Sequence, residues 1–236
     1  MDSLTHLDLC SGIGGFHLAA EWAGFRTVGF SEIEPYCCKL LAEKWPEIKN
    51  YGDLRTADFS DLGHPTVLSA GVPCQPASLA GKRRGKEDDR WLWEAVLDVV
   101  GSVKPTWAIF ENPDGILSVE AFAPILLRLD DLGYEVRGFH VPANAVGANH
   151  RRFRVFIVAY SHCSRLSGAE YQTIQGAGRR EKGRAASELL RPESDASLLR
   201  KVHGVRNRRD RIKALGNSVC PQQAYPFFEA IAQIEV

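Results

Sequence analysis

Short apolar runs and stretches of helical spacing alternate along the first two thirds of the chain. The first apolar run, residues 6–10, is followed by the turn Ser11-Gly-Ile-Gly-Gly, after which apolar residues recur at helical spacing from Phe16 to Trp22. Runs of the first kind predict strands at 6–10, 27–30, 67–70, 107–110, 134–141 and 153–159. Spacing of the second kind predicts helices at 16–22, 36–45, 91–103, 119–132 and 224–234.

This order of elements predicts an open α/β sheet with helices on both faces, in which ligands bind at the carboxyl ends of the strands. The pattern stops after residue 160. Residues 161–210 are rich in Gly, Ser and Arg and contain few apolar side chains, which is typical of a loop-rich insert. We therefore expect one main domain formed by residues 1–160 and 211–236, with residues 161–210 as a small insert.

The charges of the chain are divided between two parts. The total is balanced, with 29 Lys and Arg against 29 Asp and Glu. Residues 151–213, however, carry 16 basic against 6 acidic side chains, and the rest of the chain carries 13 against 23. A basic segment attached to an acidic body is the asymmetry expected when one part of a protein meets a polyanion.

The start of the chain and its cysteines bear on location and redox state. The residues after Met1 are polar, and no apolar run approaches the length of a membrane span, so we expect a cytoplasmic protein without a membrane partner. The six cysteines lack paired Cys-x-x-Cys spacing. In a reducing compartment they are expected to be free thiols, with no disulfide and no metal site, and one of them is then available for chemistry.

The first strand and glycine turn suggest a nucleotide-like ligand, because glycines expose backbone N–H groups and permit close approach. A dinucleotide fingerprint needs Gly-x-Gly-x-x-Gly, whereas Gly12 and Gly14 are followed by His17, which disfavours a nicotinamide dehydrogenase. Glu32 follows the second strand, where a carboxylate binds ribose hydroxyls, and Ile33 could cover an adenine face. The alternative is a solvated Glu and a core Ile.

A thiol and a carboxylate follow two neighbouring strands. Cys74 lies between Pro73 and the pair Gln75-Pro76, on a stiff turn that faces the ligand edge; the alternative, a small buried hydrophobe, is the usual fate of a cysteine. Glu111 ends the strand predicted at 107–110 and is delivered to the same edge. We therefore expect the two groups to converge.

Basic residues accompany this pair. Arg152 and Arg154 open the last strand on one face, where paired guanidinium groups suit a phosphate or a base carbonyl, although a surface basic cluster is an equal alternative. The charged stretch 82–90 could close over a bound strand or be a solvated surface loop.

Taken in chain order, these pieces resemble the cytosine carbon-5 DNA methyltransferase family: Asp8-Leu-Cys-Ser-Gly-Ile-Gly-Gly-Phe16, Glu32, Gly52-Asp53, Pro73-Cys74-Gln75, Glu111-Asn112, Arg152-x-Arg154 and Leu215-Gly-Asn217-Ser-Val. The resemblance covers residues 6–160 and 211–236. Ala77, Pro113 and His150 depart from the usual Phe, Val and Gln of the family, and the insert is shorter than the usual target-recognition region.

The resemblance implies a Rossmann-like S-adenosylmethionine-dependent methyltransferase sheet, with S-adenosylmethionine as methyl donor and no metal. It implies a nucleophilic role for Cys74, and a role for Glu111, Arg152 and Arg154 in holding the target cytosine. The implied cofactor residues are Gly12, Gly14, Phe16, Glu32, Ile33, Asp53, Leu54, Pro73, Asn217 and Ser218. The implied DNA-binding residues are Gln75, Ser78, Lys82, Arg83, Arg84, Arg179, Arg180, Arg184, Arg206, Arg208 and Arg209.

The chemistry demands such a set independently. Carbon 5 of cytosine is a feeble nucleophile, so a thiolate that adds to carbon 6 creates an enamine-like intermediate able to attack a methyl sulfonium. A protonated Glu111 can donate to ring nitrogen 3 and neutralise the charge that develops. Because carbon 6 is inaccessible in a stacked duplex, the cytosine must be flipped out.

Double-stranded DNA is the expected partner, and we expect a monomer from a prokaryote or phage, associated with the nucleoid and with a restriction endonuclease or helper subunit as a possible companion. One branch of the family methylates transfer RNA, so RNA is the nearest alternative substrate. A DNA-binding relative without activity is another alternative, but such a protein is expected to have lost Cys74 or Glu111, and both are present.

Overall fold

The computed structural model describes residues 3–73, 92–118, 122–148, 152–161 and 208–235. Within these ranges one sheet has the order β2-β1-β3-β4-β6-β5. Its strands are β1 (Thr5–Leu9), β2 (Arg26–Ser31), β3 (Val67–Gly71), β4 (Trp107–Asn112), β5 (Tyr134–Pro142) and β6 (Phe153–Ser161). The first four run parallel to one another, whereas β6 is antiparallel to both of its neighbours. The mixed α/β sheet confirms the predicted fold class.

The helices follow the predicted order with shifted ends. They are α1 (Gly15–Trp22), α2 (Pro35–Lys44), α3 (Trp93–Val103), α4 (Phe122–Asp131), α7 (Arg208–Asn217) and α8 (Pro221–Glu235), with short 3₁₀ turns η1 (Ser60–Leu62), η3 (Asp114–Ser118) and η4 (Ala143–Val146). The closing helix begins three residues before the predicted start at 224, because Pro221 is well suited to the first helical position. Helix α7 was not predicted.

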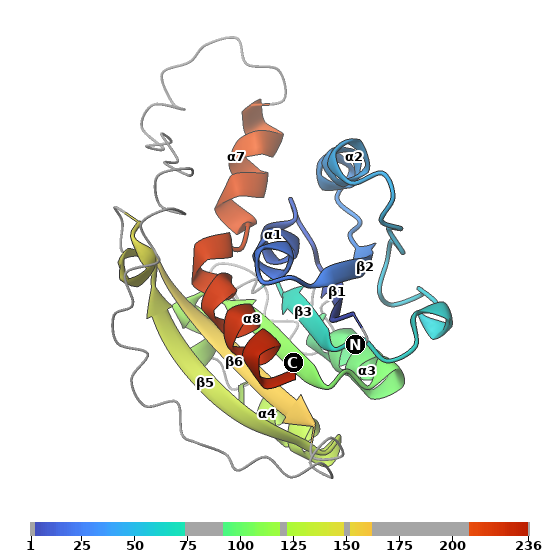
Figure 1. The fold of residues 1–236 in the computed structure, drawn as a ribbon. Helices are drawn as coiled ribbons and strands as arrows, with labels where there is room; N and C mark the ends of the chain where they lie inside the picture. The colour runs from blue at the N-terminus through green and yellow to red at the C-terminus, as the bar shows by residue number, and fades with distance from the viewer. Residues whose placement is uncertain (1–2, 74–91, 119–121, 149–151, 162–207, 236) are drawn as a thin grey trace, which may run out of the picture.

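Two layers of helices cover the sheet, as Figure 1 shows. Alternate residues of β4 illustrate the division: Ala108 and Phe110 join the core under α3 and α4, whereas Trp107 and Ile109 join the core under α1 and α8. Such alternation is expected of a strand buried on both sides. The central strand β4 is thus covered on both faces, whereas the middle of the edge strand β5 is exposed.

One stretch of the face under α1 is polar. His6 Nδ1 lies 2.9 Å from the Thr27 hydroxyl, and His6 Nε2 lies 2.8 Å from the Ser69 hydroxyl. Ser69 in turn donates to Asp8 Oδ1 at 3.1 Å, and His17 Nδ1 shares the Thr27 hydroxyl at 2.9 Å. All five side chains are buried, so the hydrogen bonds offset the cost of removing them from water.

The glycine turn before α1 is packed from two directions. Gly14 has φ of 84°, and a Cβ there would meet the Trp45 ring at 2.7 Å. A Cβ on Gly15 would collide with the backbone carbonyl of Val219. Only glycine fits at these positions, so the turn is held between the end of α2 and the loop that precedes α8.

Candidate active site

Residues from distant parts of the chain meet at one edge of the sheet. The parallel strands β1 to β4 end there, and β6 begins there because it runs in the opposite direction. Gly71 at the end of β3 is the register partner of Glu111 in β4. Glu32 follows β2, and Arg152 precedes β6. Glu32, Glu111 and Arg152 therefore all lie at this carboxyl edge.

Glu111 and Arg154 form a buried ion pair at this edge. The register partner of Glu111 is Phe156, two residues beyond Arg154, so both charged side chains lie on the same face. Arg154 Nε lies 2.5 Å from Glu111 Oε1, and both side chains are largely buried. The N–H is not aligned with the oxygen, so within the described residues each of these two atoms lacks a directed hydrogen bond.

The electrostatics of Glu111 favour its protonated form more than in water. Burial raises the pKa of this carboxyl, and the nearby Arg154 and Arg152 guanidinium groups oppose the rise without cancelling it. A carboxyl with a raised pKa can donate a proton to a bound base.

Arg152 makes different contacts from Arg154. Its Nη2 donates to the carbonyls of Gly216 at 3.0 Å and Ser218 at 2.7 Å. Burial lowers the pKa of this guanidinium. Arg152 is thus bound to backbone carbonyls in the last turn of α7 and just after it, whereas Arg154 is paired with Glu111. A ligand shared by the two arginines stays a prediction.

On the opposite side of the edge, Glu32 organises the glycine turn. Its carboxylate accepts the backbone N–H of Gly12 at 2.7 Å, of Ile33 at 2.8 Å and of Glu34 at 2.7 Å. The Ile33 side chain is 57% exposed. An exposed branched aliphatic side chain beside a carboxylate suits an amphipathic ligand such as an adenosine.

Asn50 is a residue of this region that the sequence reasoning missed. Its side-chain oxygen accepts the N–H of Glu32 at 3.0 Å and of Gly52 at 3.1 Å. It thereby joins the end of β2 to the turn that carries Asp53, whose carboxylate is held by Arg55 at 2.7 Å. Arg55 also lowers the pKa of Asp53. An Asn two residues before Gly52 is a turn signal that could have indicated this role.

The other implied cofactor residues have varied surroundings. Phe16 and Leu54 are buried in the two cores, and the Phe16 ring packs edge-on against Phe156. Open space surrounds the position of a Cβ on Gly12, and Pro73 and Asn217 are exposed. Ser218 donates its hydroxyl to the carbonyl of Val219. Their contact with a cofactor stays a prediction.

Several implied site residues lie outside the described residues: Cys74, Gln75, Ser78, Lys82, Arg83, Arg84, Arg179, Arg180, Arg184 and Arg206. Arg208 and Arg209 begin helix α7, for which only the backbone is described at these positions. The charged stretch 82–90 and most of the insert 161–210 are also outside these ranges. The convergence of Cys74 with Glu111 therefore stays a prediction.

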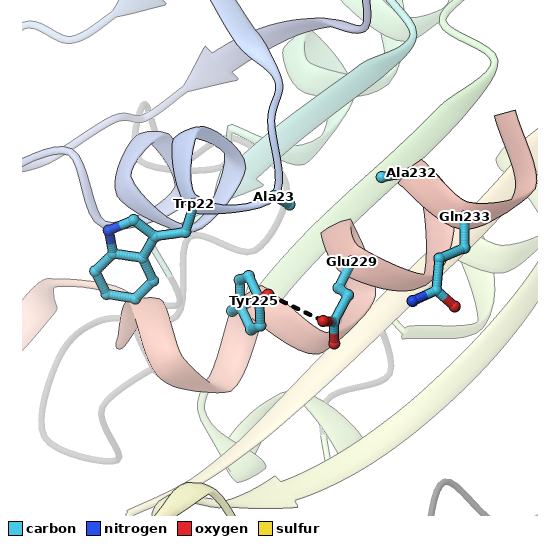
Figure 2. Close-up of a pocket in the computed structure, with 6 residues that line it drawn as sticks. All are labelled: Trp22, Ala23, Tyr225, Glu229, Ala232 and Gln233. Atoms are coloured by element: carbon cyan, nitrogen blue, oxygen red, sulfur yellow. Dashed lines mark hydrogen bonds between the residues drawn. The ribbon is translucent and has the colours of Figure 1, made fainter. Parts of the chain in front are cut away.

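A separate hollow of about 440 Å³ lies between α1 and α8, and Figure 2 shows the side chains around it. Its lining includes Trp22, Tyr225 and Glu229, and the Tyr225 hydroxyl donates to Glu229 at 3.0 Å. Trp22 ends α1, whereas the glycine turn precedes α1, so the hollow is at the opposite end of the helix from the candidate site.

Two further searches cover only the residues that the structure describes. Among them, no helix is long and apolar enough to cross a membrane. Nor do these ranges contain a group of three or more His, Cys, Asp or Glu side chains arranged to hold a metal ion.

Comparisons with known proteins show the family of this chain. The family model described as C-5 cytosine-specific DNA methylase matches residues 4–195. The chain is 35% identical over 180 residues to the type II methyltransferase M.HgiBI of Herpetosiphon aurantiacus, covering 72% of this chain and 40% of that protein. It is 33% identical over 159 residues to M.NgoBI of Neisseria gonorrhoeae, covering 66% and 50%. The chain thus spans half the length or less of these curated relatives.

Among solved structures, a variant of Spodoptera frugiperda DNMT2 superposes with a TM-score of 0.61 at 19% identity, covering 73% of this chain and 54% of that one. At this identity the similarity shows the fold alone.

Proposed function

Because the chain belongs to the C-5 cytosine-specific DNA methylase family, we propose that it methylates carbon 5 of cytosine in duplex DNA with S-adenosylmethionine as methyl donor. The buried Glu111–Arg154 pair carries the proposal. It stands beside Gly71, the strand end that leads to Cys74 three residues later. Addition of a thiolate to a cytosine ring requires a proton donor and a nearby cation, and this pair lies beside the strand end that precedes Cys74.

The residues of the opposite side of the edge fit the adenosine part of the donor. Gly12 is open, Ile33 is exposed, and the Glu32 carboxylate lies between them. When bound, S-adenosylmethionine supplies an electrophilic methyl group on sulfur. In this proposal Glu32 orients a ribose through its carboxylate, and Asn217 at the end of α7 and Ser218 after it also contact the donor.

The proposed sequence of steps conserves atoms and charge. The Cys74 thiolate forms a bond to carbon 6 of the base while Glu111 gives its proton to ring nitrogen 3, which makes carbon 5 nucleophilic. Arg154 keeps the carboxylate in place after it has lost the proton. Carbon 5 then takes the methyl group from the sulfonium sulfur, which keeps the electron pair of the broken bond. A base removes the proton from carbon 5, the Cys74 sulfur leaves as a thiolate while carbon 5 and carbon 6 regain their double bond, and ring nitrogen 3 returns its proton to Glu111.

DNA is favoured over RNA by the names of the relatives, which are type II methyltransferases. The basic residues 151–213 agree with either polyanion. Methyl transfer from tritiated donor to duplex DNA and to total RNA, measured side by side, separates the two. We expect transfer to DNA, and transfer to RNA alone would overturn the choice.

The thiol is tested with DNA that contains 5-fluorocytosine, which cannot release a proton from carbon 5. The wild-type chain should form an adduct with this DNA that survives denaturation, and Cys74→Ala should form none. Cys37→Ala is the matched control, because burial raises the pKa of that thiol to about 12 and keeps it protonated. Equal adduct yield in Cys74→Ala would falsify the assignment.

The insert 161–210 is proposed as the segment that reads DNA. Arginine is a common bidentate reader of guanine and also binds phosphate, and the insert has many arginines between Arg154 and Asn217. Residues 165–205 are replaced by a short Gly/Ser linker, and donor binding and plasmid methylation are measured together. Retained donor binding with lost methylation supports the assignment, whereas unchanged methylation at the same sites contradicts it.

A further inference from the structure

Gln223, near the start of α8, is a buried polar residue that the proposed reaction does not use. It is 0% exposed. Its side-chain nitrogen donates to the carbonyl of Val141 at 2.7 Å and to the carbonyl of Arg152 at 3.0 Å. Both hydrogens of the amide are thereby used. Burying an amide without such hydrogen bonds is costly, so these two contacts determine the orientation of the Gln223 side chain.

The two carbonyls belong to residues next to Arg154, one on the neighbouring strand and one earlier in the chain. Val141 is the register partner of Arg154 across the β5–β6 pair, and Arg152 precedes Arg154 by two residues on the same face. The Arg152 carbonyl also accepts the Ala143 N–H, and Gln223 adds a tie from α8 to the backbone from which the Arg154 side chain reaches Glu111. Without these bonds, nothing else in α8 is placed to hold both strands by hydrogen bonds among the described residues.

Arg152 connects the same strand to the loop before α8 in the other direction. Its guanidinium donates to Gly216 and Ser218, while its own carbonyl accepts from Gln223. We call these contacts the clamp. The Gln223 side chain in α8 holds the start of β6, and the Arg152 side chain, just before β6, holds the segment that leads into α8. Asn217 ends α7 and Ser218 follows it, so the clamp reaches the two implied cofactor residues that precede α8.

We propose that Gln223 is a positioning residue, whose side-chain amide fixes the start of β6 and so sets the approach of Arg154 to Glu111. Its catalytic consequence rests on the proposed function, but the positioning is a property of the folded chain alone. A small displacement of Arg154 is expected to matter, because misplacement of about 1 Å can lower a catalytic rate by about a hundredfold.

The test compares Gln223→Met with wild type and with Gln222→Met. Met has a length similar to Gln but donates no hydrogen bond, and Gln222 is the adjacent, partly exposed glutamine that accepts from the Cys220 thiol. Glutamate carboxyl carbons are labelled with carbon-13, the Glu111 signal is identified by its loss in Glu111→Gln, and each protein is titrated. Melting curves confirm that the variants are folded.

The arginines oppose the burial-induced rise in the pKa of Glu111. If the clamp is removed, their opposition weakens, so Glu111 should titrate at a higher pH in Gln223→Met than in wild type or Gln222→Met. A folded Gln223→Met protein with an unchanged Glu111 titration overturns the proposal. A structural role elsewhere in the core would alter melting without altering this signal.

A second measurement needs no substitution and covers the case in which Gln223→Met does not fold. In wild type, the side-chain amide protons of Gln223 should exchange with solvent far more slowly than those of the exposed Gln233. Equal exchange rates overturn the proposal.

Kinetics separate this inference from the proposed function. With tritiated donor and duplex DNA, Gln223→Met should lower kcat on the order of tenfold to a hundredfold and leave KM for DNA near the wild-type value. If the wild-type chain transfers no methyl group, the proposed function fails, while the Glu111 titration and the amide exchange still decide the positioning role. A normal kcat together with a normal Glu111 titration counts against it.

Discussion

Two buried carboxyl groups of this chain, Glu111 and Asp8, have different surroundings. Burial raises the pKa of both, that of Asp8 to about 8. At Glu111 the opposing groups are the guanidinium groups of Arg154 and Arg152. At Asp8 they are neutral donors, the Ser69 hydroxyl and the backbone N–H of His17. The rise in pKa caused by burial is therefore opposed by cations at Glu111 and only by neutral hydrogen-bond donors at Asp8.

The difference follows the geometry of the sheet. Glu111 is near the end of β4, at the edge where ligands reach an α/β sheet, whereas Asp8 lies within β1 and is covered by α1. A carboxyl at the edge can exchange a proton with a substrate. A carboxyl inside the layer holds its proton at neutral pH and serves the packing.

The largest effect is expected at the edge. Glu111→Gln should lower turnover by about a hundredfold or more, because the variant cannot release a proton to the base. Initial rates of methyl transfer at saturating DNA measure the change. Glu94→Gln on the exposed side of α3 is the control. A near-normal turnover with only KM altered would remove Glu111 from the chemistry.

The next effect concerns the pH dependence of stability. The folded-state pKa of Asp8, about 8, is above its ordinary value of 3.8, so between these values the folded chain holds a proton that the unfolded chain has released. Stability from this group is fully present below pH 3.8 and is lost as the pH rises towards 8. Asp8→Asn should therefore flatten the fall of unfolding free energy over this range.

Urea unfolding at pH 5, 7 and 8.5 measures that slope, with Asp58→Asn as the exposed control. His6 acts in the opposite sense: burial lowers its pKa from 6.5 to about 3, so its contribution falls as the pH drops through this range. The slope is accordingly compared above pH 7. A slope in Asp8→Asn equal to that of wild type would contradict a buried, protonated Asp8.

The smallest effect is expected from Ser69→Ala, which removes the hydroxyl between His6 and Asp8. Leaving these buried groups without their partner should cost about 1–3 kcal/mol of unfolding free energy. Turnover per folded molecule should change little, because Ser69 is within β3 and away from the edge. Ser102→Ala on the surface of α3 provides the comparison, and an equal loss in both variants would speak against the network.

The positions of the strands along the chain could be predicted because a buried parallel strand is a continuous apolar run with a turn on each side. The position of Glu111 followed from the same rule, since a residue that ends such a run reaches the carboxyl edge. Helix α7 could not be found in this way, because residues 208–217 are strongly polar and have no apolar stripe.

Contacts between side chains and distant backbone carbonyls could not be predicted from the sequence either. The division of work between Arg152 and Arg154 depends on where Gly216 and Ser218 lie, 64 and 66 residues further along the chain. Asn50 and Gln223 likewise act on backbone groups that no local pattern reveals. Sequence spacing predicts which residues reach the carboxyl edge of the sheet, but not which of their side chains form hydrogen bonds to distant backbone groups.

The reversed direction of β6 has a consequence for the order of folding. In the sheet, β5 pairs with β6 and β6 pairs with β4, so β5 has no strand partner until residues 153–161 are in place. Long-range pairings of this kind form slowly. During synthesis from the N-terminus, β1 to β4 can pair first, whereas β5 must wait for residues 153–161. We expect chains truncated before residue 153 to contain the strands β1 to β4 and to lack both the Glu111–Arg154 pair and the packing of α8 on α1.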